Sequence, residues 1–168
     1  MSEPEIVLAE RAVLRRADHQ THRRFVFHVP EACNRLDLYV RYAPKFVSVE
    51  DSQRLVHQAV SSQVAVLEPR VGTELAQGWA ADFEGAQLRV PNLLAISLDD
   101  ASGAYRGAGH RHTPEQRLTL GTESASPGLV AGPLPAGRWK LTLTAHTVVS
   151  DQCEVEIQIG AVIASSRP

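Results

Sequence analysis

Apolar and polar residues alternate along several stretches of the chain. From Arg35 to Tyr42, the apolar side chains occupy every second position, and the same holds from Arg24 to Val29 and from Trp139 to Ala145. Successive side chains of a strand point to opposite faces, so this period of two predicts strands with one buried face. The predicted strands are Ile6–Leu14, Arg24–Val29, Arg35–Tyr42, Leu94–Leu98, Arg117–Leu120, Trp139–Ala145 and Cys153–Ile159.

The middle of the chain has a helical period instead. Asp51 is a good N-cap residue, and the residues after it carry an apolar stripe with the spacing of a helix. The stripe consists of Leu55, Val56, Ala59, Val60, Val64 and Leu67. Pro69 is expected to end this helix, and a second short helix is predicted over Val71–Phe83. We therefore expect one or two inserted helices around residues 51–83.

Short strands separated by turn sequences, with one helical insertion, are typical of an all-β protein. We predict an antiparallel β-sandwich of the jelly-roll type. The glycine-rich stretch Tyr105–His112 is predicted to be a loop between two of its strands. The sequence has no internal repeat and no low-complexity linker, so a single domain over residues 1–168 is expected.

Composition narrows the classes of function. The chain has 168 residues, is 43% apolar and carries a formal charge of −2. A chain of this length can bury a core without metal or disulfides, and its charge argues against a nucleic-acid partner. It has no apolar run long enough for a membrane helix, and its acidic start lacks the pattern of a signal peptide. We expect a cytoplasmic protein in which Cys33 and Cys153 are reduced and inert.

Two histidines in the glycine-rich stretch are candidate metal ligands. His110 and His112 are two residues apart, and His146 on the polar face of a predicted strand is a possible third ligand. Imidazole is a common metal ligand, and a zinc site needs three or four such groups. The alternative is that these histidines are solvated or bond the backbone of the turn, because a lone pair of histidines at this spacing is a weak motif.

The same stretch has features of a ligand-binding loop. Glycines at 107 and 109 permit close approach of the backbone, and arginines at 106 and 111 can bind an anion. Tyr105 offers a ring on which a sugar or a partner can stack. The candidate ligand-binding residues are therefore Tyr105, Arg106, Gly107, Gly109 and Arg111. The alternatives are a turn-packing tyrosine and an ordinary solvated loop.

Other catalytic groups have little support. No serine lies in the GxSxG pattern, and Cys33 has no recognisable partner. Glu154 and Glu156 lie two apart on one predicted strand, where they can form an acid and base pair. Such carboxylates more often form the solvated side of a strand. No catalytic residue is predicted.

Several segments together resemble a known kind of module. They are Phe25–Pro30, Arg35–Leu38, Leu94–Asp100, Tyr105–His112, Ser124–Leu129, Gly132–Trp139 and Ala145–His146. This arrangement resembles the β-sandwich accessory module that precedes the catalytic domain in bacterial PHP-type (polymerase and histidinol phosphatase) metallohydrolases. The resemblance implies a non-catalytic accessory module standing alone, because the hydrolase domain would begin near Pro168. No catalytic residue of that family is carried over, since its HxH motif ends a strand of an α/β barrel that this sequence does not predict.

Three functions are compatible with these observations. The first is an interaction module that binds a partner protein, such as a separately encoded hydrolase, or a second copy of itself. The second is a module that binds a carbohydrate or another small polar ligand through residues 105–112. The third is a small hydrolase that uses a divalent metal such as zinc, held by His110, His112 and His146. The fold alone selects none of them.

Overall fold

The computed structural model describes residues 4–83, 88–109 and 112–164 of the chain. Its regular elements are eight strands, two α-helices and one turn of 3-10 helix at Arg16–Asp18. In chain order they are β1 (Glu5–Leu14), β2 (Thr21–Val29), β3 (Cys33–Ala43), α1 (Val49–Val71), α2 (Thr73–Ala81), β4 (Leu93–Asp99), β5 (Tyr105–Gly109), β6 (Glu115–Gly121), β7 (Gly137–Thr147) and β8 (Cys153–Ile163).

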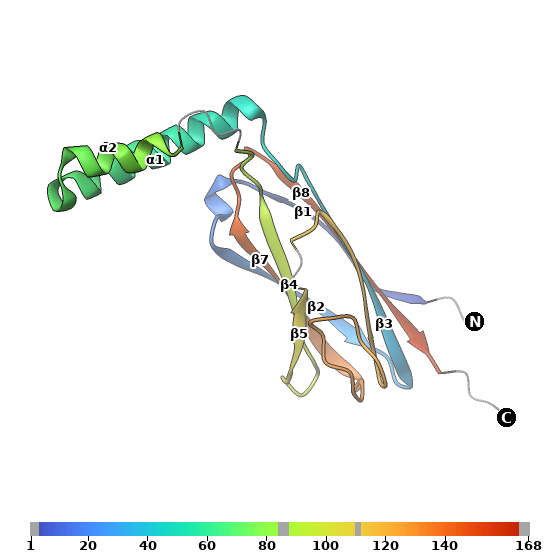
Figure 1. Cartoon of the computed structure of the whole chain (residues 1–168). Helices are drawn as coiled ribbons and strands as arrows, with labels where there is room; N and C mark the ends of the chain where they lie inside the picture. The colour runs from blue at the N-terminus through green and yellow to red at the C-terminus, as the bar shows by residue number, and fades with distance from the viewer. Residues whose placement is uncertain (1–3, 84–87, 110–111, 165–168) are drawn as a thin grey trace. The chain divides into compact units, whose positions relative to one another are not determined.

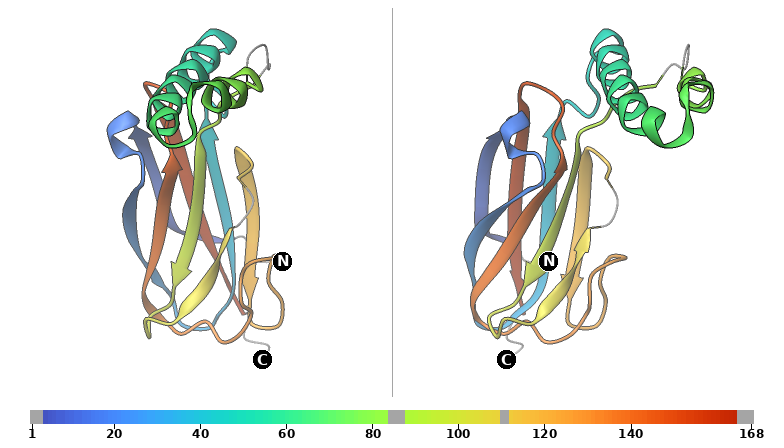
Figure 2. Two further views of the ribbon diagram at one scale, coloured as in Figure 1. Left: turned by 60° about the vertical axis from the view of Figure 1, so that its left-hand side comes forward. Right: turned by 90° about the vertical axis from the view of Figure 1, so that its left-hand side faces the viewer.

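The strands form two four-stranded sheets, with the orders β1-β8-β3-β6 and β2-β7-β4-β5. Every pairing within the sheets is antiparallel. Figure 1 shows the strands of both sheets running along one another, and Figure 2 gives two further views of the same layers. The chain changes sheet at most of its connections, and the resulting strand order is that of an eight-stranded jelly roll. The predicted fold class is confirmed.

Side chains from the inner faces of both sheets make one core. Along β3 the alternation predicted from the sequence is present, since Leu36, Leu38, Val40 and Tyr42 are buried. β7 adds Trp139, which is fully buried and lies 6.3 Å from the ring of Phe27. Both cysteines are buried and form no disulfide, so they pack in the core as small apolar residues.

One strand lies where the sequence predicted a loop. Residues 105–109 form β5, which pairs with β4 through Ile96 and Gly109, Ser97 and Ala108, and Leu98 and Gly107. The loop prediction was wrong for these residues, because glycine carries no side chain to reveal the period of a strand. The register also shifts between Leu98 and Asp99, which further obscures the pattern.

The helical segment begins and ends differently from the prediction. Ser48 is the N-cap of α1, where its hydroxyl accepts a hydrogen bond of 3.0 Å from the Asp51 backbone N–H. Pro69 does not end α1, which continues to Val71. A proline so near the C-terminal end removes only one hydrogen bond of the helix. The helix ends at Gly72, whose φ of 87° favours glycine and whose N–H bonds to Glu68 O.

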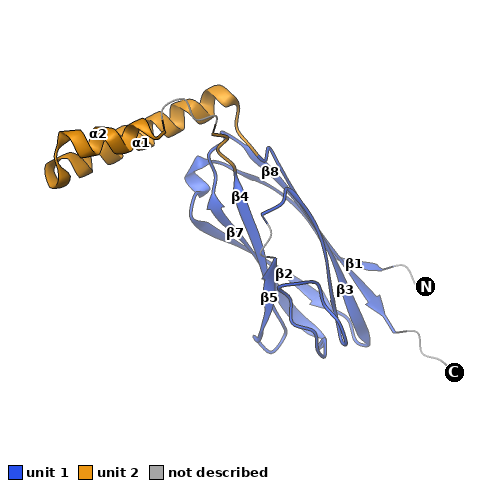
Figure 3. Cartoon of the chain, in the orientation of Figure 1, with its two compact units in different colours: residues 1–45, 92–168 blue, residues 46–91 orange. Residues whose placement is uncertain are grey.

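The chain divides into two compact units, the sandwich (residues 1–45 and 92–168) and the helical hairpin (residues 46–91), which are coloured separately in Figure 3. Hydrogen bonds close the base of the hairpin. The Asn92 N–H donates to Lys45 O at 2.8 Å, and the Val47 N–H donates to Val90 O at 3.1 Å. Within the described ranges, neither helix combines the length and apolar character that crossing a membrane requires.

Candidate functional site

Arg106 is the residue of the predicted ligand site that the structure places most firmly. Its side chain is buried, and its guanidinium lies 5.5 Å from the centre of the Trp139 ring. Its Nη atoms donate to three backbone carbonyls, at 2.7 Å to Pro133, 3.0 Å to Val130 and 3.2 Å to Gly132, and its Nε donates a further bond of 3.3 Å to Val130 O. Nη1 also lies 3.4 Å from Asp100 Oδ2. An arginine has five N–H donors, and these contacts use all of them within the fold.

The carboxylate of Asp100 is held in its charged form. Burial raises the pKa of this carboxyl group. Hydrogen bonds from Ser102, from the Ala104 N–H and from Arg106 lower it by more than burial raises it, so the pKa lies below the ordinary value of 3.8. Oδ1 accepts three of these bonds, at 2.6 Å from the Ser102 hydroxyl, 2.9 Å from the Ser102 N–H and 3.0 Å from the Ala104 N–H. Asp100 and Arg106 thus fix the 130–133 segment to β5.

This environment predicts an acid dependence of stability. Because the pKa of Asp100 is lower in the folded chain, its contribution is complete above the ordinary pKa and is lost as pH falls through the folded value. We expect the free energy of unfolding to decrease below about pH 5. Urea unfolding at several pH values measures this slope, and it is expected to be shallower in Asp100→Asn. An equal slope in both proteins would contradict the assignment.

The two glycines of the predicted site make close contacts in the sandwich. Gly107 has a φ of 105°, and a Cβ there would lie 2.1 Å from Gly128 O. A Cβ at Gly109 would lie 2.7 Å from the Gln116 Oε1 atom. Among the described members of the site, only Tyr105 is accessible, with 60% of its surface exposed. His110 and Arg111 lie outside the described residues. The structure therefore brings no ligand-binding set together from the described members of this group.

Two of the three predicted metal ligands are neighbours. The rings of His112 and His146 have centroids 5.5 Å apart and meet edge to face at 85°. Burial, and the positive charge that His112 and His22 can carry, lower the pKa of His146. His112 Nδ1 lies 3.3 Å from Leu94 O. Among the described residues, which exclude His110, no three histidine, cysteine, aspartate or glutamate side chains are placed to hold a metal ion.

A lysine that the sequence analysis did not single out anchors the backbone beside this histidine pair. Lys45 Nζ donates to His112 O at 2.6 Å, to Asn92 O at 3.0 Å and to Tyr42 Oη at 2.9 Å. Burial lowers the pKa of Lys45, and burial raises the pKa of Tyr42 to about 12. An ammonium group has three donors, so these bonds occupy all of them. Lys45 connects the ends of β3 and β4 to the β5–β6 segment.

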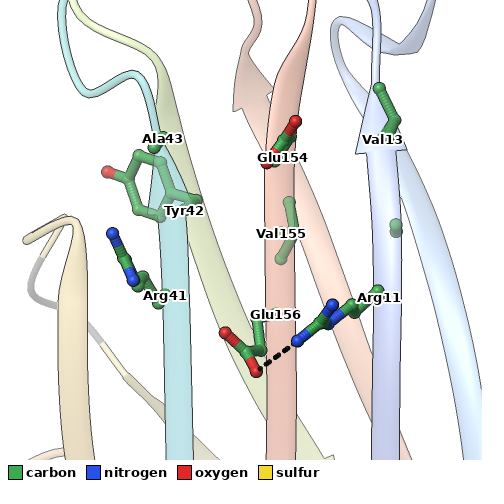
Figure 4. A pocket seen from close by; sticks show the side chains of 9 residues that line it. Arg11, Val13, Arg41, Tyr42, Ala43, Glu154, Val155 and Glu156 are labelled. Carbon is green, nitrogen blue, oxygen red and sulfur yellow. Dashed lines mark ion pairs between the residues drawn. The ribbon is translucent and has the colours of Figure 1, made fainter.

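The outer face of β1, β8 and β3 carries a charged pocket of about 490 Å³. Figure 4 shows Arg11 and Arg41 on either side of Glu156, with Glu154 further along the same strand. Arg11 Nη2 lies 3.5 Å from Glu156 Oε1, and the arginine is well exposed. Exposed ion pairs of this kind contribute little to stability. The two glutamates are thus part of a solvated strand face with alternating charges.

The helical hairpin has a pocket of a different kind, and sequence reasoning did not anticipate it. Among its described residues, α1 buries no apolar side chain and α2 buries only Ala76. A groove of about 560 Å³ runs between the helices. It is lined by Gln53, Val56, His57, Val60, Ser61, Val64, Gln77, Ala80, Phe83 and Leu88. Three residues of the stripe predicted on α1, Val56, Val60 and Val64, therefore line an open groove.

The chain is thus a jelly roll with a helical hairpin inserted between β3 and β4. No protein-family model and no curated protein matches its sequence.

Proposed function

We propose that this protein is a non-catalytic interaction module that binds a second copy of itself through its helical hairpin. The groove between α1 and α2 is the observation that carries the proposal. Its described lining includes six apolar side chains, namely Val56, Val60 and Val64 of α1, Ala80 of α2, and Phe83 and Leu88 after α2. Among the described lining residues there is no aspartate, glutamate, lysine or arginine.

The stability of a helix in water comes mainly from packing of its apolar face. α1 has 23 residues, and its only buried residue among those described is Ser52. Val49, Val66 and Val71 on α1 and Leu75 on α2 are each more than 40% exposed. Covering this apolar surface would therefore stabilise the hairpin.

A second copy is the occupant that the groove favours. Two hairpins related by a two-fold axis would place the same surface against itself and form a four-helix bundle. The described lining residues include no aspartate, glutamate, lysine or arginine, so a contact between these residues brings no like charges of those groups together. Valine predominates in the lining of α1, and β-branched residues pack well in helical interfaces of this type.

The resemblance to the accessory module of PHP-type metallohydrolases fits a non-catalytic role. A separately encoded hydrolase of that class is the alternative occupant of the groove. We place the module in the cytoplasm, where the buried, unpaired Cys33 and Cys153 would stay reduced.

The hairpin can be tested with a matched pair of substitutions. Val60→Asp puts a carboxylate in the groove, whereas Ser62→Asp puts one on an exposed position of α1 outside it. We expect the wild-type chain and Ser62→Asp to sediment as dimers. Val60→Asp should weaken association by about 100-fold or more, because two unpaired carboxylates would be buried.

Sedimentation velocity over a range of concentrations measures this difference, and far-UV circular dichroism checks that the helices persist. A wild-type chain that is monomeric at every concentration would overturn the proposal. The proposal is also overturned if Val60→Asp and Ser62→Asp associate equally, or if the protein stays monomeric and binds only a PHP-type hydrolase.

A further inference from the structure

A second pocket lies in the sandwich, independent of the helical hairpin. It has a volume of about 360 Å³, within the roughly 300–1,000 Å³ range of small-molecule sites. β5 and β6 each lie at one edge of their sheet, and both views in Figure 2 show them next to each other. The described lining residues come from these strands, from Thr113 just before β6 and from residues 126–127 after it. They are Gly109, Thr113, Glu115, Gln116, Arg117, Leu118, Ser126 and Pro127.

Gln116 gives this pocket a buried hydrogen-bond acceptor. The residue is only 6% exposed. Its Nε2 lies 3.4 Å from Thr113 O, but its Oε1 accepts no hydrogen bond within the part of the chain that the structure describes. A buried acceptor without a donor destabilises a fold, so a group of this kind in a pocket is a candidate for ligand recognition. The absence of a side chain at Gly109 makes room for Gln116 Oε1, because a Cβ at position 109 would lie only 2.7 Å from that oxygen.

Ser126 supplies a group of the opposite kind. Its Oγ accepts a hydrogen bond of 2.9 Å from the Thr119 N–H, and no bond donated by its hydroxyl is present among the described residues. The hydroxyl can therefore donate to a ligand. Leu118 and Pro127 add apolar surface to the same lining. The pocket thus combines one acceptor, one available donor and an apolar wall.

The charged residues of the lining compensate each other. Arg117 Nη2 lies 3.1 Å from Glu115 Oε1, and both side chains are more than half exposed. The arginine also lies over the ring of Tyr39, 4.5 Å from its centre. Among the lining residues that the structure describes, no other side chain is charged. The balanced charges of these described residues favour a neutral ligand over an anion or a cation.

We propose that this pocket binds a small neutral polyol of monosaccharide size. One hydroxyl of the ligand donates to Gln116 Oε1, and a neighbouring hydroxyl accepts from Ser126 Oγ. Its C–H face packs against Pro127 and Leu118. A polyol meets these requirements because each hydroxyl both donates and accepts. The sandwich carries this site without any contribution from the groove of the hairpin, so either proposal can fail alone.

The test is a titration of the isotope-labelled full chain with D-glucose and with myo-inositol, each to millimolar concentration, followed by NMR. We expect saturable shifts of the amide signals of Gly109, Gln116 and Ser126. Gln116→Met keeps the length of the side chain and removes its oxygen. We expect this variant to bind at least about tenfold more weakly.

Gln116→Met should also raise Tm by about 2–4 °C, because the unsatisfied acceptor is gone. The matched control is Gln152→Met, an exposed position of the sandwich outside the pocket, which should change neither quantity. If Gln116→Met gains stability and loses binding, this would support a role of Gln116 in ligand binding and not in folding. The proposal is overturned if neither polyol gives saturable shifts, if the shifts lie away from β5 and β6, or if Gln116→Met binds as tightly as the wild-type chain.

Discussion

Replacing Arg106 by alanine is expected to lower the free energy of unfolding by about 3–5 kcal/mol. The change leaves the buried carboxylate of Asp100 without its cation and leaves the carbonyls of Val130, Gly132 and Pro133 without donors. It also removes the group that lies over the Trp139 ring. Losing one partner of a buried ion pair is costly because the other charge remains desolvated.

Urea unfolding followed by tryptophan fluorescence measures this effect. Arg106→Lys should recover only part of the loss, because an ammonium group cannot place five donors in the fork that these acceptors require. Arg138→Ala, at an exposed position of β7, is the control and should change stability little. A loss no larger than that of the control would show that Arg106 does not hold the 130–133 segment.

Gly107→Ala is expected to destabilise the chain by roughly 2–5 kcal/mol, the sum of two separate penalties. The φ of 105° is unfavourable for any residue with a Cβ, and the new methyl group would lie 2.1 Å from Gly128 O. The close contact with Gly128 O would force β5 away from the 128–129 segment. Gly107 and Ala108 are joined to that segment by backbone pairing.

Gly103→Ala separates the two penalties. Gly103 has a φ of 85°, but nothing lies within 4 Å of the position of its Cβ. Its substitution should therefore cost only about 1–2 kcal/mol, from the backbone alone. Chemical denaturation of both variants measures the difference. Equal losses would mean that the close approach of the 128–129 segment to β5 contributes nothing measurable.

The strands with a clear alternation could be predicted from the sequence. β3 and β7 each place large apolar residues at every second position, and one face of each is buried as a result. β5 could not be predicted in this way. Its inward position at residue 106 holds an arginine, whose burial depends on acceptors from residues 130–133 that no local pattern reveals.

The candidate site shows the same limit. The sequence singled out residues 105–112 as a candidate site, but among those described the glycines serve backbone packing, and Arg106 uses its donors within the fold. Gln116 lay just outside the predicted strand, which began at Arg117, and so its burial could not be foreseen. The apolar stripe of α1 was visible in the sequence, yet a stripe alone does not say whether the fold covers it.

The closed base of the helical hairpin has an evolutionary consequence. The chain leaves the sandwich at Lys45 and returns at Asn92, and these two residues are hydrogen-bonded neighbours. A segment whose two ends meet in this way imposes no register on the strands beside it, and changing its length costs little closure entropy. Helices between β3 and β4 can therefore be lengthened, exchanged or lost over time while the jelly roll keeps its strand order. Kinship among such proteins should be sought in the sandwich, with the hairpin compared separately.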